Sequence, residues 1–219
     1  MFGAIADRYD LMNRVMTLGM DGKWRRDAAD HAALSPGDRA LDVACGTGDL
    51  TFELARRVVP TGSATGIDFT QEMLGIARRK AAATKLPVRF EYGDALDIPF
   101  PDGSFTAATC AFGLRNMEDR PRALREMTRV VAPKGRVVIL ELTPPTNPLA
   151  RAYMDTVVPR LGQVLARARD AYSYLPASAE EFLDAPALAA LMQRAGLVGI
   201  GYRFLNLGTV ALHWGTKPD

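Results

Sequence analysis

The sequence predicts an α/β fold with a mainly parallel sheet, and three observations support that prediction. Apolar runs of strand length alternate with helix-length segments whose apolar residues recur every three or four positions. A glycine turn, Cys45 to Gly48, joins the first predicted strand to a helix. The chain has 219 residues, 48% of them hydrophobic, which suits one α/β domain with a complete core.

The first half of the chain shows the alternation most clearly. Patterns of strand type predict strands at Arg39 to Val43, Ala64 to Ile67 and Val88 to Tyr92, with helices at Leu50 to Val59 and Gln71 to Ala83 between them. Strands connected through helices pair in parallel and become covered on both faces, so this half is expected to form parallel strands of one sheet.

The alternation continues after a proline-rich turn at Pro99 to Ser104. A buried strand is predicted at Phe105 to Phe112, a helix at Arg120 to Val131, and the most apolar strand of the chain at Gly135 to Leu142. These two strands bring the parallel set to five.

The regular pattern is interrupted before the last elements. Residues 144–186 are expected to form a helical insertion over the site, because a loop of that length without its own structure is uncommon in a compact domain. A helix at Ala187 to Ala195 and an antiparallel hairpin of Val198 to Leu205 with Thr209 to Thr216 complete the chain. This arrangement resembles the Rossmann-like, seven-stranded class I methyltransferases, here as one domain over residues 1–219.

Composition limits the partners and the compartment. With 27 basic and 25 acidic residues the net charge is +2, so nothing calls for nucleic acid. Cys45 and Cys110 fall in apolar, strand-like runs and are predicted to be reduced core thiols, as in a cytoplasmic protein. Met1 to Tyr9 has no secretory pattern, and no run of about 18 apolar residues occurs. A soluble protein, at most peripheral to a membrane, is expected.

The glycine turn is the most informative local feature. Gly46 and Gly48 let a ligand approach the backbone with no side chain between them. Asp68 lies twenty positions beyond Gly48, at the end of the next strand, where a carboxylate can bind the two hydroxyls of a ribose. A ligand containing a ribose is therefore predicted at this turn.

The neighbouring charges indicate which ribose ligand fits. Thr51 stands where the dinucleotide fingerprint has its third glycine, and Asp42 and Asp49 would repel a pyrophosphate. The same carboxylates would attract the sulfonium and amino groups of S-adenosylmethionine. An NAD-dependent oxidoreductase and a non-catalytic nucleotide-binding module are the alternatives from other classes.

Three stretches then resemble one family, the ubiquinone/menaquinone biosynthesis C-methyltransferases. They are IADRYDLMNRVMTLGMDGKWRR near the start, AFGLRNMEDRPRALREMTRVVAPKGRVVILELTPP in the centre, and YSYLPASAEEF, ALAALMQRAGL and LNLGTVALHWG towards the end. The likeness covers nearly the whole chain. The chain departs from the family pattern at Thr17, Asp21 and Ala111, where Ser, His and Ser are usual or common, and at Lys134-Gly135, which keeps one glycine.

The resemblance implies S-adenosylmethionine as the methyl donor, S-adenosylhomocysteine as the product, and no metal. Asp68 is expected to hold the ribose, and Asp94 and Ala95 the adenine edge. With the residues of the glycine turn, the expected cofactor-binding set is Asp42, Gly46, Thr47, Gly48, Asp68, Phe69, Asp94, Ala95 and Ala111.

Arg115 and Asn116, in Gly-Leu-Arg-Asn after a strand end, are the residues implied for catalysis. Arginine stays protonated, so Arg115 is expected to stabilise a developing phenolate and to orient a water. The alternative for Arg115 is a surface salt bridge with Glu118 or Asp119.

Tyr9 and Asn13 are expected to contact substrate hydroxyls from an amino-terminal helical lid, residues 1–30. They are four positions apart and would share one helix face, so plain helix packing is their alternative. The two histidines, His31 and His213, are expected to be structural.

The expected reaction is C-methylation of a demethylated isoprenoid quinol. Alanine- and arginine-rich composition favours a bacterial menaquinone precursor, demethylmenaquinol, over the polyprenyl methoxy-benzoquinol of the ubiquinone pathway. Another small phenolic or lipid acceptor is the alternative within the class. The resemblance also implies a homodimer, and a membrane-borne substrate implies peripheral contact with the inner face of the cytoplasmic membrane, for which 149–169 supplies arginines among apolar residues.

Overall fold

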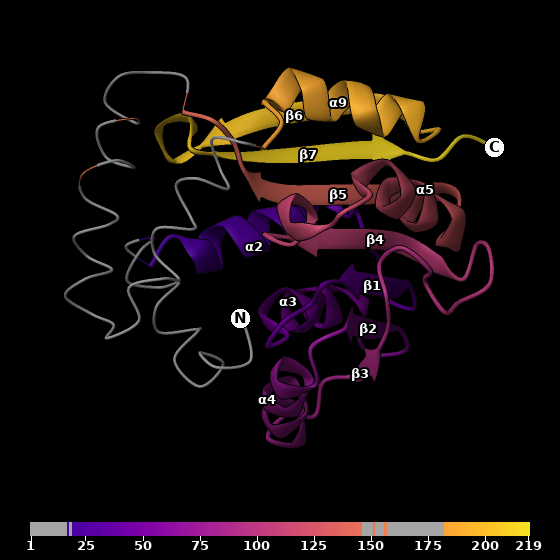
Figure 1. Cartoon of the computed structure of the whole chain (residues 1–219). Coiled ribbons are helices and arrows are strands. Elements are labelled where there is room, and N and C mark those ends of the chain that lie inside the picture. Colours follow the sequence, from indigo (N-terminus) through magenta and orange to yellow (C-terminus); the bar gives the residue numbers. More distant parts are fainter. Residues whose placement is uncertain (1–16, 18, 146–150, 152–155, 157–181) are drawn as a thin grey trace.

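Seven strands form one sheet in the order β3-β2-β1-β4-β5-β7-β6 (Figure 1). The structure is a computed structural model, and it describes residues 17, 19–145, 151, 156 and 182–219. Five strands are parallel: β1 (Arg39–Val43), β2 (Ser63–Asp68), β3 (Val88–Tyr92), β4 (Phe105–Ala111) and β5 (Val131–Leu142). Strand β7 (Val210–Thr216) pairs antiparallel with β5, and the edge strand β6 (Val198–Leu205) pairs antiparallel with β7, so β6 runs in the direction of β5. The predicted fold class and the final hairpin are confirmed.

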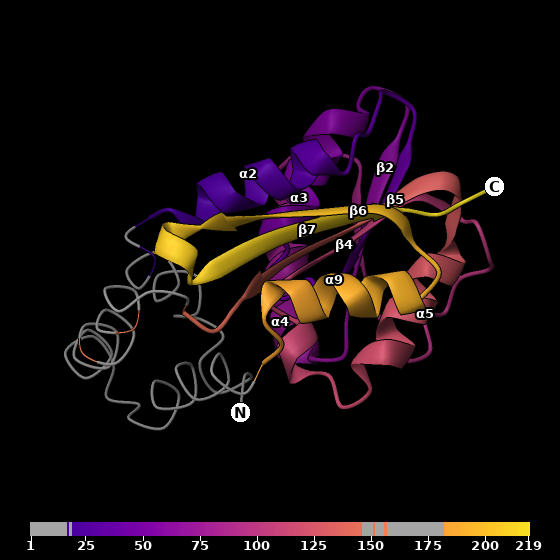
Figure 2. The ribbon, with the colours of Figure 1, turned by 90° about the horizontal axis from the view of Figure 1, so that it is seen from above.

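Helices cover both faces of the sheet. Figure 2 shows α2 (Asp21–His31) and α3 (Asp49–Val58) on one face, and α5 (Arg120–Val130) and α9 (Ala185–Arg194) on the other. The helix α4 (Gln71–Ala82) packs against β3 and β2. Side chains alternate between the two faces of the sheet and contribute to a core on each face, which explains why a strand such as β1 is buried at four of its five residues.

Local signals fix where the helices on the second face begin. The carboxylate of Asp119 accepts the N–H of Arg122 (2.9 Å) before α5, and Asp184 accepts the N–H of Ala187 (2.8 Å) before α9. Each helix has a proline in its first turn, where the missing N–H costs no hydrogen bond. These caps place α9 two residues earlier than predicted, at Ala185.

Two predictions about β5 and the cysteines were wrong. The strand begins at Val131, directly after α5, and not at Gly135, because a bulge opposite Phe105 to Ala107 carries it through Pro133 and the left-handed Lys134 (φ 65°). Cys45 lies in the turn after β1 and only Cys110 lies in a strand, although both are free thiols. Burial raises the pKa of each thiol, which keeps it protonated.

The predicted lid and insertion fall largely outside the described residues. Their described ends belong to the core: Trp24, Ala28 and Ala29 of α2 are buried, as is Phe182 before α9. The lid, the insertion and the membrane contact of 149–169 stay predictions for the remaining residues. Across the described segments, no helix combines the length and the apolar character needed to cross a bilayer.

Gly135 tests the close packing of β5 on β4. A Cβ at this position would lie 2.3 Å from the backbone oxygen of Thr106, so Gly135→Ala should lower the free energy of unfolding by about 2–3 kcal/mol. Gly75, in α4, is the matched control, since its Cβ would meet only the end of Arg79 at 3.8 Å; Gly75→Ala should stabilise the protein by about 0.5–1 kcal/mol. Urea denaturation of both variants measures this, and equal effects would contradict the packing described.

Candidate active site

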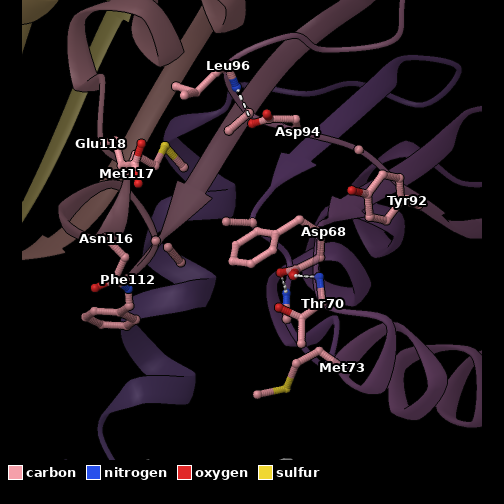
Figure 3. Close-up of a pocket in the computed structure, with 17 residues that line it drawn as sticks. Asp68, Thr70, Met73, Tyr92, Asp94, Leu96, Phe112, Asn116, Met117 and Glu118 are labelled. Atoms are coloured by element: carbon pink, nitrogen blue, oxygen red, sulfur yellow. Dashed lines mark hydrogen bonds between the residues drawn. The ribbon is translucent and has the colours of Figure 1, made fainter. Parts of the chain in front are cut away.

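The carboxyl ends of β1, β2, β3 and β4 meet around a cavity of about 480 Å³, here called the strand-end pocket. Its volume falls in the usual range for small-molecule sites. Figure 3 shows Asp68, Thr70, Met73 and Tyr92 on one side and Phe112, Asn116, Met117 and Glu118 on the other. The full lining is Ala44, Gly46, Asp68, Phe69, Thr70, Met73, Tyr92, Gly93, Asp94, Ala95, Leu96, Ala111, Phe112, Gly113, Asn116, Met117 and Glu118.

Asp68 connects the end of β2 to the glycine turn. Its Oδ2 accepts the N–H of Gly46 (2.8 Å) and its Oδ1 accepts the N–H of Thr70 (2.8 Å), two bonds that hold the carboxylate at the pocket wall (Figure 3). An ionised carboxylate has about four acceptor positions, so two remain for the hydroxyls of a ribose. This geometry fits the role predicted for Asp68.

Backbone strain gathers at the pocket. Ala44 (φ 55°) and Phe112 (φ 58°) follow β1 and β4 in the left-handed region, which costs free energy for residues other than glycine. Gly113 lets these two turns approach, since a Cβ there would lie 2.7 Å from the Cβ of Ala44. At Gly46 a Cβ would meet no atom within 4 Å, so the turn is open on the side of the pocket.

A second, smaller cavity of about 30 Å³ adjoins the glycine turn; we call it the glycine-turn cavity. It shares Ala44, Gly46 and Ala111 with the strand-end pocket, so the two spaces are neighbours. Its lining is Arg25, Asp42, Ala44, Cys45, Gly46, Thr47, Asp49, Leu50 and Ala111. Asp49 lines this cavity, but its Oδ1 is bound to Nζ of Lys80 at 2.8 Å, which offsets its charge.

Asp42 is a buried carboxyl group at the end of β1. The hydroxyls of Thr51 (2.7 Å) and Thr109 (3.1 Å) donate to its two oxygens, and its residue is 1% exposed. Burial raises the pKa of Asp42 from 3.8 to about 7, against the lowering effect of these two hydrogen bonds and of the Arg25 charge. Asp42 can therefore change its charge near neutral pH.

Arg115 has a buried partner that the sequence did not indicate. Its Nη1 donates to Oε1 of Glu141 (2.8 Å) and to the carbonyl of Phe112 (2.6 Å), while Oε2 of Glu141 accepts the N–H of Arg115 (3.1 Å). The side chains are 5% and 1% exposed, so the expected alternative, a surface salt bridge with Glu118 or Asp119, is wrong. Arg115 does not line the pocket, whereas its neighbour Asn116 does.

The remaining predicted residues divide into four groups. Phe69, Ala95 and Ala111 line the strand-end pocket, as does Asp94, one of whose oxygens accepts the N–H of Leu96 (2.8 Å). Thr47 lines the glycine-turn cavity, whereas Gly48 lines neither space and instead packs against Phe90 as the left-handed residue before α3. Tyr9 and Asn13 lie outside the described residues.

Neither histidine reaches the pocket. Nδ1 of His31 lies 2.8 Å from the carbonyl of Asp27, and Nε2 of His213 lies 2.9 Å from the carbonyl of Ala185. Burial lowers the pKa of His213, which favours its neutral form. The structural roles expected for both are consistent with these contacts. In the described part of the chain no three His, Cys, Asp or Glu side chains gather as a metal site would require.

Sequence reasoning missed several residues of the two cavities. Tyr92, Met73 and Glu118 line the strand-end pocket, and Arg25 reaches the glycine-turn cavity from α2. Tyr92 is the last residue of a predicted parallel strand, so its position could have indicated that it lies at the site. Arg25 had no such signal, because its place depends on how α2 packs on the sheet.

The fold and the site define a class of enzyme. The strand order, the antiparallel β7, and a pocket made by a glycine turn with an acidic residue after β2 are those of the class I S-adenosylmethionine-dependent methyltransferases. A methyltransferase of Aquifex aeolicus described as dependent on that donor has the same fold. It superimposes with a TM-score of 0.64 at 19% identity, over 88% of each chain.

Sequence comparison identifies the family. The profile of the ubiE/COQ5 methyltransferase family matches residues 1–217, and the chain belongs to that family. It is 47% identical to a demethylmenaquinone methyltransferase of Thermus thermophilus, over all of both chains. It is 46% identical to a demethylmenaquinone methyltransferase of Deinococcus radiodurans, over 99% of this chain and 91% of the relative. The resemblance noted in the sequence is thereby confirmed.

Asp42 generates a testable pH dependence of stability. Because its pKa is about 7 in the folded protein and 3.8 ordinarily, the folded state binds this proton more tightly than the unfolded state. The stabilisation is complete below about pH 4 and is lost as pH rises to about 7. Asp42→Asn removes this pH-dependent stabilisation. The unfolding free energy of the variant minus that of wild type should therefore rise by up to about 4 kcal/mol between about pH 4 and pH 7. A difference that is constant from pH 4 to 8 would contradict the raised pKa.

Proposed function

We propose that this chain transfers a methyl group from S-adenosylmethionine to a ring carbon of demethylmenaquinol. The observation that carries the proposal is the 47% identity, along both full chains, with the Thermus thermophilus demethylmenaquinone methyltransferase. S-adenosylmethionine supplies an electrophilic methyl group on a sulfonium, and a quinol ring carbon beside an ionised hydroxyl is a suitable nucleophile.

Different residues of the pocket bind different parts of the cofactor and the quinol in this proposal. Asp68 accepts the ribose hydroxyls, and Asp94 with Ala95 borders the adenine, since both line the pocket beyond β3. Phe112, Met117 and Met73 give the pocket apolar walls, which exclude water from a reacting carbon. The quinol ring then enters beside Asn116, opposite Asp68 (Figure 3).

Arg115 acts on the reaction as a positioning residue in this proposal. Its bonds to Glu141 and to the carbonyl of Phe112 fix the turn from which Phe112, Gly113 and Asn116 face the pocket. Direct stabilisation of a phenolate, the role expected from the sequence, would need guanidinium donors other than Nη1, which is bound to Glu141 and to the carbonyl of Phe112. A fixed turn affects the reaction rate strongly, because small displacements of reacting groups lower the rate by large factors.

The substrate also sets where the enzyme works. An isoprenoid tail keeps the quinol in a bilayer, so we propose transient contact with the membrane surface. Phe69 (66% exposed) and Tyr92 (59% exposed) line the pocket and present exposed aromatic surface near Asp68. The homodimer, the cytoplasmic location and the absence of a metal requirement stay predictions.

Asp68→Ala tests the ribose contact. Loss of two hydrogen bonds to a charged group should weaken S-adenosylhomocysteine binding by about 10²-fold or more, measured by calorimetry. Asp102→Ala is the control, since Asp102 is a surface carboxylate paired with Arg129, outside the pocket lining. A loss below about threefold in Asp68→Ala would remove the proposed role.

The reaction itself is tested by transfer of labelled methyl to demethylmenaquinol in vesicles, with polyprenyl methoxy-benzoquinol as the competing acceptor. Wild type should methylate the first in preference. Arg115→Ala alone would leave Glu141 as an unpaired buried charge, at about 3–5 kcal/mol, so the informative variant is Arg115→Gln with Glu141→Gln. Its turnover should fall by about 10²-fold while S-adenosylhomocysteine affinity stays within about twofold.

The matched control is Arg129→Gln with Glu126→Gln, an ion pair (2.7 Å) outside the pocket lining, which should keep wild-type turnover. Undiminished turnover in the Arg115 and Glu141 variant would overturn the positioning role. Preference for the benzoquinol would overturn the choice of substrate, and no methyl transfer to either quinol would overturn the proposed function.

A further inference from the structure

Arg25 lies on α2 and lines the glycine-turn cavity. Its residue is 7% exposed, and its side chain lines the glycine-turn cavity together with Asp42, Gly46 and Thr47. Its guanidinium carbon stands 5.6 Å from the ring centre of Phe112, which lines the strand-end pocket. A buried cation is thus held beside the backbone of the glycine turn.

The guanidinium retains capacity for a ligand. Among the described residues, its one side-chain hydrogen bond runs from Nη1 to Oδ2 of Asp21 (2.5 Å). Asp21 is itself fixed, since Thr17 donates to its other oxygen (3.1 Å). A guanidinium carries five N–H donors in a planar fork that matches a carboxylate, so most of the fork remains for another acceptor.

No other described residue offers a positive charge to this space. Of the described residues that line either cavity, Arg25 is the single lysine or arginine. Among the described residues, Arg25 is therefore the one that would face an anionic group of a ligand in these cavities.

The positions of the other contacts show which end of the methyl donor reaches Arg25. Asp94 lies beyond β3, Asp68 follows β2, and Gly46, which hydrogen-bonds Asp68, lines both cavities. With the adenine near Asp94 and the ribose on Asp68, the chain attached to the sulfur continues past Gly46. Its amino acid end, one ammonium and one carboxylate, then enters the space between Asp42 and Arg25.

We propose that Arg25 binds the carboxylate of the methionyl end of the methyl donor, as a hydrogen-bonded ion pair, with Asp42 facing the ammonium group. The inference rests on the proposed function, because it takes the adenosyl site at Asp68 as given. It assigns to α2 a direct part in cofactor binding and makes Asp21 the residue that orients the guanidinium.

The test compares three ligands by calorimetry: S-adenosylhomocysteine, its decarboxylated analogue, and methylthioadenosine, which lacks the amino acid end. Wild type should bind S-adenosylhomocysteine about 30- to 100-fold more tightly than the decarboxylated analogue. The double variant Arg25→Met with Asp21→Asn removes the guanidinium and leaves no unpaired carboxylate at position 21. In this variant the preference for S-adenosylhomocysteine over the decarboxylated analogue should fall to about threefold or less. Methylthioadenosine should bind that variant with wild-type affinity, which also reports that the site is folded.

Two further variants sharpen the result. Arg25→Lys keeps the charge but loses the fork, so it should keep a preference of about 3- to 10-fold. Arg57→Met, which breaks an ion pair with Asp30 (2.7 Å) between α3 and α2, should keep the full preference. A wild-type preference in the Arg25 variants, with all adenosyl ligands bound, would overturn the role of Arg25 and leave the proposed function standing. Failure of wild type to bind any of the three ligands would overturn both.

Discussion

The site depends on one hydrogen bond, from the N–H of Gly46 to the carboxylate of Asp68. It joins the turn after β1 to the end of β2, two segments 22 positions apart in the chain. The parallel register places Val43 opposite Ile67, so that Asp68 reaches the turn as soon as both strands end. Gly66 permits this close approach, because a Cβ there would lie 2.8 Å from the sulfur of Cys45. The carboxylate is thereby oriented before any ligand arrives, which lowers the cost of binding.

Buried charges around this bond are arranged in pairs. Arg25 pairs with Asp21, and Arg115 pairs with Glu141. Unpaired charges in such positions would be costly, so each pair holds its arginine in a defined orientation. Asp42 is the exception, since its carboxyl has only hydroxyl donors and its pKa rises towards neutrality. A ligand that carries an ammonium group would supply the missing counter-charge.

Local patterns were sufficient to predict most of the fold. The strands β1, β3 and β6 begin and end where the sequence places them, because alternation and flanking turn residues mark both ends. The start of β5 was missed, since Pro133, Lys134 and Gly135 resemble a turn and only pairing with β4 makes them strand. Asp68, Asp94 and Ala111 were predictable because parallel strands bring their carboxyl ends together. The partner of Arg115 could not be predicted, because Glu141 lies 26 positions away in the sequence, on β5.

A crystal structure of the protein with S-adenosylhomocysteine tests the central claim most directly. The account predicts the ribose hydroxyls within hydrogen-bonding distance of both oxygens of Asp68, with the Gly46 bond intact and the homocysteine end directed past Gly46. A nucleoside bound elsewhere, or one whose ribose makes no contact with Asp68, would contradict it.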